Sequence, residues 1–333
     1  MKISVIGGGA WGTTLAQLLV DNGHDVLIYE INPEHIDTIN NQGRHPFFNN
    51  TLDPKIKATN DINKVTDFAI YFVLSVPTKA MRIVLKNINK VLKTKSVFIN
   101  VSKGIEPETS KRVSEIVSEE IDSDKLLGFV ALTGPSHAEE VIERKVTLLV
   151  AASADEDLAV NVQQIFANPK YMRIYTSNDL IGAEVGGAVK NAIAVISGIC
   201  TGLGLGENAR AALISRGILE IIRVVEHMGG RRDTAFGLTG IGDLIVTASS
   251  ENSRNFQAGK KIGQGVPLNQ VFDMEKQTIE GVRTIDAVHQ LSIKHDIDLP
   301  MINTAYEVLF EGLSIDDALE KLLNRTLKVE EII

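Results

Sequence analysis

The chain has 333 residues, a formal net charge of −8 at pH 7 and hydrophobic side chains at 44% of its positions. This length predicts two domains of ordinary size, and the composition excludes a disordered chain. The net negative charge argues against binding to nucleic acid or to an anionic membrane through the overall charge of the protein. A local basic pocket for a small anion stays compatible with it.

The chain contains one cysteine, Cys200. A single cysteine excludes an internal disulfide framework and a cysteine metal site. Because Cys200 lies in an apolar, glycine-rich stretch, we expect a small buried thiol rather than a nucleophile. The chain opens with a strand pattern and shows neither a signal peptide nor a run of 18 apolar residues. We therefore expect a soluble, cytoplasmic protein without membrane insertion.

The first half of the chain alternates short β-branched runs with helical patterns. Strands are expected at 3–6, 26–29, 68–74, 97–101, 128–132 and 147–151. Helices between them are expected at 13–22, 80–91 and 111–120. Strands that alternate with helices indicate βαβ units and a mostly parallel sheet. The predicted fold class is therefore α/β, with a doubly wound sheet of the Rossmann type in the N-terminal domain.

The second half of the chain has few strand-like runs. Helices are expected at 182–194, 208–228, 284–295, 303–312 and 315–324. Asp316 and Asp317 suit the N-terminal end of the last of these helices. We therefore expect a dinucleotide-binding domain over residues 1–185 and a mainly α-helical, substrate-binding domain over residues 186–333.

The first strand is followed by a glycine-rich turn with the spacing of a dinucleotide-binding fingerprint. Gly7 allows the tight turn, Gly9 lets the backbone approach a pyrophosphate, and Gly12 lets the helix pack close to the strand. Ala10 and Trp11 lie at the start of this helix, where backbone N–H groups and the helix dipole favour phosphate. The alternative is a glycine-rich turn without a ligand.

Glu30 ends the second expected strand. In a dinucleotide-binding unit, an acid at this place accepts hydrogen bonds from a ribose hydroxyl. The alternative is a solvated carboxylate at the end of a strand.

Several further segments have specific patterns and occur in a consistent order along nearly the whole chain. They are residues 7–13, 76–80, 101–106, 134–140, 184–191, 237–244, 253–255 and 280–284. Together they resemble the bacterial NAD(P)-dependent glycerol-3-phosphate dehydrogenases. The resemblance implies reversible reduction of dihydroxyacetone phosphate to sn-glycerol 3-phosphate, a precursor of glycerophospholipids. It also suggests a homodimer, for which the helical domain offers apolar faces.

Hydride transfer to a ketone needs a proton donor at the carbonyl oxygen, and the reverse reaction needs a base there. Lys190 lies on an apolar helix, where burial of a charge costs free energy unless the charge is paired. The resemblance implies that Lys190 is the proton acceptor; a snorkelling surface lysine is the alternative. Asp243 beside Lys190 would favour the charged lysine, against the effect of burial.

Lys103 follows an expected strand, which places it at the carboxyl edge of a parallel sheet, where α/β folds bind ligands. The resemblance implies that Lys103 contacts the substrate and the nicotinamide; an exposed loop lysine is the alternative.

Ser136 and Glu139 have the spacing of a capping box, so we expect Ser136 to begin a helix. The resemblance places Gly134 and Ser136 near the substrate and Ala138 near the cofactor.

The substrate phosphate needs cationic and hydrogen-bonding groups. Arg254 and Asn255 supply such donors, and the resemblance implies that Arg254 lies near both the phosphate and the cofactor. Asn191 can fix hydroxyl groups, and Thr247 offers one further hydroxyl. The resemblance adds Ser253 to the substrate contacts and Glu280 to the cofactor contacts. An exposed polar turn is the alternative for residues 253–255.

His137, beside Ser136, could be the acid or base instead, because histidine is the commonest general base. The resemblance assigns this role to a lysine. The His, Asp and Glu residues show no metal-ligand spacing, so we expect no metal.

Three parts of the chain depart from the pattern that is usual in this family. Many members carry an arginine just after the second strand, which suits the 2′-phosphate of NADP, whereas this chain has Glu30 and Ile31. We therefore predict that NADH is preferred over NADPH, which stays possible because Lys2 or Arg44 could reach the site. The loop at 45–50 also differs, so we assign it no contact. Ala10 stands where serine is frequent, which leaves only its backbone N–H for the phosphates.

Two other functions fit parts of this sequence. A related dehydrogenase for 3-hydroxyacyl or 6-phosphogluconate substrates would have the same two-domain plan. Residues 190–191, Asp243 and residues 253–255 together suit a small phosphorylated triose better. A regulatory module that binds NADH without turnover is the second alternative, and the presence of Lys103, Lys190 and Asp243 argues against it.

Overall fold

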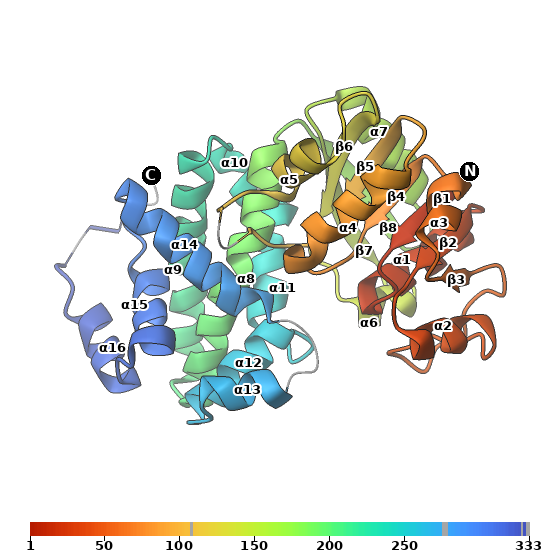
Figure 1. Cartoon of the computed structure of the whole chain (residues 1–333). Coiled ribbons are helices and arrows are strands. Elements are labelled where there is room, and N and C mark those ends of the chain that lie inside the picture. Colours follow the sequence, from red (N-terminus) through yellow and green to blue (C-terminus); the bar gives the residue numbers. More distant parts are fainter. Residues whose placement is uncertain (107–108, 275–278, 328, 331–333) are drawn as a thin grey trace. The chain divides into compact units, whose positions relative to one another are not determined.

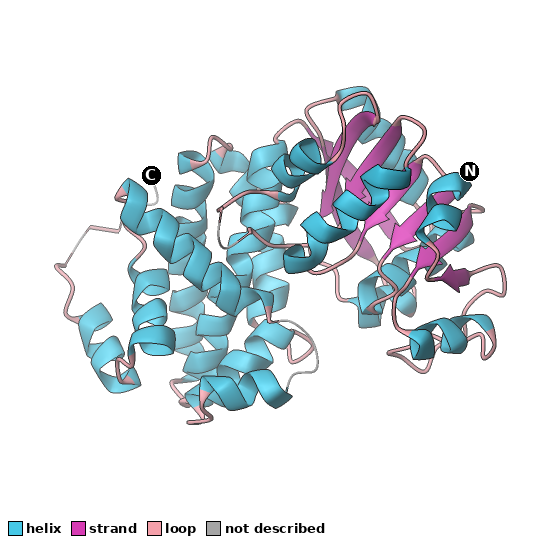
Figure 2. Cartoon of the chain, in the orientation of Figure 1, coloured by secondary structure: helices cyan, strands magenta, loops and turns pink. Residues whose placement is uncertain are grey.

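The computed structural model describes residues 1–106, 109–274, 279–327, 329 and 330 (Figure 1). The chain divides into two compact units. The first comprises Met1–Lys103 and Lys111–Leu180, and the second comprises Gly104–Ser110 and Ile181–Ile333. Strands occur in the first unit, whereas the described part of the second unit is helical (Figure 2).

The first unit contains one sheet of eight strands in the order β3-β2-β1-β4-β5-β6-β7-β8. All neighbours pair in parallel except β6 and β7, which are antiparallel. The predicted α/β class with a doubly wound Rossmann-type sheet is confirmed. The strands are β1 (Lys2–Ile6), β2 (Asp25–Tyr29), β3 (Lys57–Thr59), β4 (Tyr71–Leu74), β5 (Ser96–Asn100), β6 (Leu126–Thr133), β7 (Thr147–Ala152) and β8 (Met172–Ser177).

Helices cover both faces of this sheet. They are α1 (Ala10–Asp21), α2 (Pro33–Asn40), α3 (Ile62–Phe68), α4 (Thr78–Val91), α5 (Val113–Glu120), α6 (Ala138–Ile142) and α7 (Glu156–Phe166). Side chains on the two faces of β1 pack into different hydrophobic cores. Ile3 and Val5 pack with α1, α6 and α7, whereas Ile6 packs with α3, α4 and α5. This alternation follows from the two-residue period of a strand and explains why the strands carry few charges.

The strand predictions differ from the structure in three places. Phe68 was expected in a strand but ends helix α3, which Asp61 begins by accepting a hydrogen bond from the backbone N–H of Asn63. Strand β3 was not predicted, because its three residues are too few to show a period. Strand β8 was not predicted either, because exposed Arg173 and Tyr175 interrupt its apolar pattern.

The second unit is built from helices that surround α8. They are α8 (Leu180–Gly202), α9 (Gly206–His227), α10 (Arg232–Ala235), η1 (Leu238–Gly242), α11 (Asp243–Ala248), α12 (Arg254–Gly263), α13 (Leu268–Met274), α14 (Glu280–His295), α15 (Pro300–Tyr306), η2 (Glu307–Glu311) and α16 (Ile315–Leu323), of which η1 and η2 are π-helices. Asp316 and Asp317 lie in the first turn of α16, as predicted.

Helix α8 is long and apolar enough to cross a membrane, but 89% of its most apolar window is buried inside the structure. It is therefore a core helix. Its backbone lies very close to that of α12, because a Cβ atom on Gly259 would lie 2.0 Å from the carbonyl oxygen of Val195. Cys200, near the end of α8, is half-buried rather than fully buried as expected, and burial raises the pKa of its thiol.

Candidate functional site

The glycine turn lies at the switch point of the sheet, where β1 has β2 on one side and β4 on the other. Gly7 has a φ of 107°, and a Cβ atom there would lie 2.6 Å from the carbonyl oxygen of Ser75, which follows β4. A Cβ atom on Gly12 would lie 2.0 Å from the carbonyl oxygen of Gly7. Both positions therefore require glycine.

Gly9 differs from its neighbours in the turn. A Cβ atom there would meet nothing within 4 Å, so the protein itself does not require glycine at this position. Gly9 is the N-cap residue of α1, and Ala10 and Trp11 form the first positions of the helix. The space over Gly9 faces the positive end of the helix dipole, which fits a bound phosphate group. The turn therefore fits a dinucleotide.

Glu30 follows β2 and is only 8% exposed, so it is not a solvated carboxylate. Its Oε1 accepts hydrogen bonds from the backbone N–H groups of Ile31 at 2.8 Å and Asn32 at 2.9 Å. Its Oε2 lies 2.8 Å from the place of a Cβ atom on Gly8, so this oxygen lies against the glycine turn. Ile31 is 74% exposed and brings no charge to this place.

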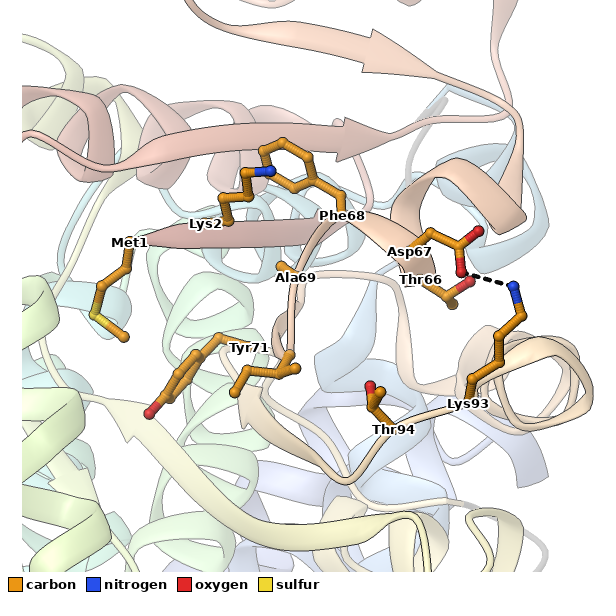
Figure 3. A pocket seen from close by; sticks show the side chains of 10 residues that line it. Met1, Lys2, Thr66, Asp67, Phe68, Ala69, Tyr71, Lys93 and Thr94 are labelled. Atoms are coloured by element: carbon orange, nitrogen blue, oxygen red, sulfur yellow. Dashed lines mark hydrogen bonds and ion pairs between the residues drawn. The ribbon is translucent and has the colours of Figure 1, made fainter.

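Lys2 does not reach the glycine turn, so the expectation that it could do so is wrong. Lys2 begins β1 and the turn follows Ile6, which separates the two by four strand rises, or about 13 Å. The ammonium group of Lys2 lies over the ring of Phe68, 5.3 Å from its centre. Figure 3 shows Lys2 in a hollow at this amino edge, with Lys93 paired to Asp67 at 2.9 Å.

The loop at 45–50, for which we predicted no cofactor contact, lies against the start of α1. His45 is buried, and its Nδ1 accepts a hydrogen bond from the backbone N–H of Phe47 at 3.1 Å. Its Nε2 therefore carries the proton and donates to the carbonyl oxygen of Ala10 at 3.2 Å. The ring stacks on Phe48 with 4.5 Å between ring centres. Burial lowers the pKa of His45 to about 4.

Lys103, Gly134 and Ser136 meet at the carboxyl edge of the sheet. The Lys103 ammonium group donates to the carbonyl oxygen of Gly134 at 2.9 Å, and the Ser136 hydroxyl donates to the same oxygen at 3.0 Å. Ser136 does not begin helix α6, contrary to the prediction. The N-cap residue is His137, and Ala138 is the first helical residue. The capping box is not formed because the Ser136 hydroxyl is held by Gly134 instead.

The second unit brings Lys190, Asp243 and Thr247 together. Lys190 is 4% exposed, so it is not a snorkelling surface lysine. Its ammonium group lies 2.9 Å from Asp243 Oδ1 and donates to Thr247 Oγ1 at 2.6 Å. The Thr247 hydroxyl in turn donates to the carbonyl oxygen of Asp243 at 2.6 Å. Asp243 therefore lies beside Lys190, and the ion pair balances the buried charge.

The starts of α12 and α14 lie beside Asn191. The side-chain oxygen of Asn255 accepts a hydrogen bond from the backbone N–H of Gly281 at 2.9 Å. A Cβ atom on Gly281 would lie 2.4 Å from the carbonyl oxygen of Asn191, so this approach requires glycine. The first residue of α14 is Glu280.

Ser253 and Arg254 take different places at the start of α12. Ser253 is the buried N-cap residue, and its hydroxyl accepts a hydrogen bond from the backbone N–H of Phe256 at 3.2 Å. Arg254 is the first helical residue and is exposed. A guanidinium group beside the positive end of a helix dipole suits an anion.

His35, which no sequence pattern singled out, lies beside Glu30. Its Nδ1 lies 3.6 Å from Glu30 Oε2. The signal that could have found it is the start of α2, where Asn32 is the N-cap residue and Pro33 the first helical residue. This start places residue 35 in the first turn, next to the end of β2. Among the described residues, no group of three or more His, Cys, Asp or Glu side chains could hold a metal ion.

Both halves of the chain match models of one family. The model of the NAD-dependent glycerol-3-phosphate dehydrogenase N-terminus matches residues 2–159, and the C-terminus model matches residues 179–320. The chain belongs to the glycerol-3-phosphate dehydrogenase family. The glycerol-3-phosphate dehydrogenase [NAD(P)+] of Acholeplasma laidlawii is 61% identical over 332 residues and 100% of both chains. That of Staphylococcus epidermidis is 44% identical over 99% of both chains.

Solved structures of glycerol-3-phosphate dehydrogenases agree with this assignment. The enzyme of Coxiella burnetii has a TM-score of 0.91 and 32% identity over 97% of this chain and 99% of its own. A ketopantoate reductase of Ralstonia eutropha has a TM-score of 0.62 and 16% identity over 97% of this chain and 100% of its own, which shows a shared fold alone. The predicted family is therefore confirmed.

Proposed function

We propose that this glycerol-3-phosphate dehydrogenase family member catalyses reversible hydride transfer between NAD(P)H and dihydroxyacetone phosphate. The product is sn-glycerol 3-phosphate, which serves glycerophospholipid synthesis in the cytoplasm. The observation that carries this proposal is the buried group of Lys190, Asp243 and Thr247. A buried ion pair costs desolvation, so its presence in an apolar helical core is best explained by chemistry.

Lys190 is the acid and base of the reaction. A bound nicotinamide supplies or takes up the hydride. In the direction of reduction, the Lys190 ammonium group donates a proton to the substrate oxygen; in the reverse direction, the neutral amine accepts it. Asp243 and Thr247 hold the nitrogen of Lys190 in place, and the carboxylate favours the charged lysine before proton transfer.

The substrate is held by polar groups from several elements. Arg254 and Asn255, at the positive end of α12, bind the phosphate. Lys103, whose orientation Gly134 fixes, contacts the substrate carbonyl oxygen. The remaining substrate contacts come from Gly134, Ser136, Asn191, Thr247 and Ser253.

The glycine turn binds the cofactor. NADH is preferred over NADPH. The turn contributes Gly7, Gly9, Ala10, Trp11 and Gly12, and the other contacts are Glu30, Lys103, Ala138, Arg254 and Glu280. The buried carboxylate of Glu30 lies against the turn and accepts a ribose hydroxyl, whereas it repels a 2′-phosphate. NADPH therefore binds more weakly.

The dinucleotide-binding domain comprises residues 1–185 and the substrate-binding domain residues 186–333, and each also supplies some of the contacts to the other ligand. We also propose a homodimer. The second unit exposes large apolar side chains, among them Phe236, Ile245 and Phe310, which suit an interface between copies. Sedimentation equilibrium measures the mass of the assembly and therefore tests this part of the proposal.

The experiment that tests the function compares NADH oxidation with dihydroxyacetone phosphate and with dihydroxyacetone, which lacks the phosphate. We expect turnover with the phosphorylated substrate and a kcat/KM at least about 100-fold lower without the phosphate, because charge-assisted hydrogen bonds to Arg254 are lost. Equal rates with both compounds would contradict the phosphate role of Arg254. The absence of turnover with either would leave the protein as a binder of NADH.

A further inference from the structure

The two carboxylate oxygens of Glu30 have different surroundings. Oε1 is occupied, because it accepts hydrogen bonds from two backbone N–H groups, those of Ile31 and Asn32. Oε2 lies beside Gly8 and 3.6 Å from His35 Nδ1. Oε2 is therefore the oxygen that can take a ribose hydroxyl, and His35 is the side chain next to it.

His35 is held in this place by the start of α2 and by an aromatic contact. The side chain of Asn32 caps the helix by accepting the backbone N–H of Glu34 at 2.9 Å. The imidazole ring packs against Phe47 edge to face, with ring centres 4.9 Å apart. Its Nδ1 is buried and makes no hydrogen bond within the described residues. A buried nitrogen without a partner is costly, so its position beside a carboxylate calls for an explanation.

We propose that His35 sets the choice between NADH and NADPH through the charge of Glu30. While the His35 ring is neutral, the carboxylate keeps its full charge beside the ribose and rejects a 2′-phosphate. When the ring is protonated, the imidazolium offsets that charge and the 2′-phosphate is tolerated. This inference rests on the proposed role of Glu30 as the reader of the ribose. His35 is thus a positioning residue that acts through Glu30.

The other charged groups near His35 do not produce the same effect. His45, on the other side of Phe47, is buried, and its pKa of about 4 keeps it neutral between pH 6 and pH 8. Glu34 on α2 itself and Lys57 on β3, which packs against α2, are exposed to solvent. Solvent screens the charges of these two exposed side chains. Histidine is the side chain that ordinarily changes charge between pH 5 and pH 8.

The test measures dissociation constants of NADH and NADPH by titration calorimetry at pH 6 and pH 8, without substrate. Binding to the whole protein is a readout that does not depend on turnover. The selectivity is the Kd for NADPH divided by the Kd for NADH. A phosphate monoester also gains a proton near pH 6, so part of any change belongs to the 2′-phosphate itself. The His35→Phe variant keeps the ring contact with Phe47. Its change in selectivity between the two pH values therefore measures the contribution of the 2′-phosphate alone.

We expect the selectivity of the wild-type protein to fall between pH 8 and pH 6 by about threefold to tenfold more than that of His35→Phe. The Glu30→Gln variant removes the charge on which His35 acts and should show only the change due to the phosphate. It serves as the second variant if His35→Phe does not fold. The same pH dependence in wild type and variants overturns the inference. A wild-type protein that prefers NADPH at pH 8 contradicts the proposed cofactor preference instead, which is a different result.

Discussion

The ammonium group of Lys190 lies 2.9 Å from Asp243 Oδ1, and both side chains are buried in the helical unit. Lys190 comes from α8 and Asp243 begins α11, so two helices far apart in sequence form the pair. Thr247, one turn along α11, binds both partners. These contacts fix the position of the Lys190 ammonium group in the structure.

The Asp243→Asn substitution removes the negative partner of Lys190. We expect kcat to fall by about 100- to 1,000-fold, since the acid-base group loses both its orientation and its charge balance. NADH binding should change little. Steady-state kinetics and calorimetry measure the two effects. Asp286→Asn on α14 is the matched control, and an equal loss in both variants would speak against a specific role of Asp243.

The Arg254→Ala substitution removes the cation at the start of α12. We expect kcat/KM for dihydroxyacetone phosphate to fall by about 10- to 100-fold, because a charge-assisted contact with the phosphate is lost. The rate with dihydroxyacetone should fall less, because only the proposed cofactor contact of Arg254 is lost with that substrate. Lys261→Ala removes a cation from the other end of the same helix and serves as the control. A loss of equal size with both substrates would argue that Arg254 does not bind the phosphate.

Gly9→Ala and Gly12→Ala separate binding from folding. Gly9 has room for a methyl group and a φ of −68° that alanine adopts, but it is the N-cap residue, where alanine is a poorer cap than glycine, so the stability of the variant should stay within about 1 kcal/mol of the wild type. Its Kd for NADH should rise about tenfold, because the methyl group occupies the place of the pyrophosphate. Gly12→Ala clashes within the turn and should lose about 1–3 kcal/mol. Chemical denaturation and NADH titration check both, and unchanged binding in Gly9→Ala would place the pyrophosphate elsewhere.

Glu220 gives the helical unit a pH dependence of stability. It is buried on α9, and its carboxylate accepts the backbone N–H groups of Met301 at 2.6 Å and Ile302 at 3.1 Å. Burial raises the pKa of Glu220 from 4.5 to about 7, although the two N–H groups act in the opposite direction. The folded protein therefore holds a proton between pH 4.5 and pH 7 that the unfolded chain has released.

The free energy of unfolding should accordingly fall as the pH rises from about 5 to 7 and then level off, with a contribution from Glu220 of up to about 3 kcal/mol. Urea denaturation at a series of pH values measures this slope. Glu220→Gln should flatten it, whereas Glu226→Gln, an exposed position on the same helix, should not. The same slope in Glu220→Gln and wild type would mean that Glu220 does not titrate in this range.

Much of the fold was predictable from the sequence, because patterns among neighbouring residues indicate where most of its strands and helices lie. The β-branched runs of the first unit and the turn at Gly7 and Gly12 need only neighbouring residues to be recognised. The pattern failed where the same spacing is compatible with another local structure. Phe68 reads as part of a strand but ends a helix, and Ser136 has capping spacing but binds Gly134. In both cases the structure that forms has a hydrogen bond between residues two positions apart, Ser136 to Gly134 and Asn63 to Asp61.

The sequence proposes the members of the candidate site but not their geometry. The sequence placed Lys190 on an apolar helix, but only the fold shows that Asp243 reaches it. The sequence also singled out Glu30, but not that one of its oxygens is occupied and the other lies near His35. Such relationships depend on side-chain direction, which spacing along the chain does not determine.

The Lys190→Ala substitution tests the central claim most directly. It removes the amine that is proposed to donate and accept the proton, while it leaves the glycine turn untouched. The measurement pairs the kcat for dihydroxyacetone phosphate with the Kd for NADH in the same preparation. We predict that NADH still binds with its wild-type Kd and that kcat falls by at least about 100-fold. Unchanged turnover in Lys190→Ala would contradict the account, because the proton would then come from another group.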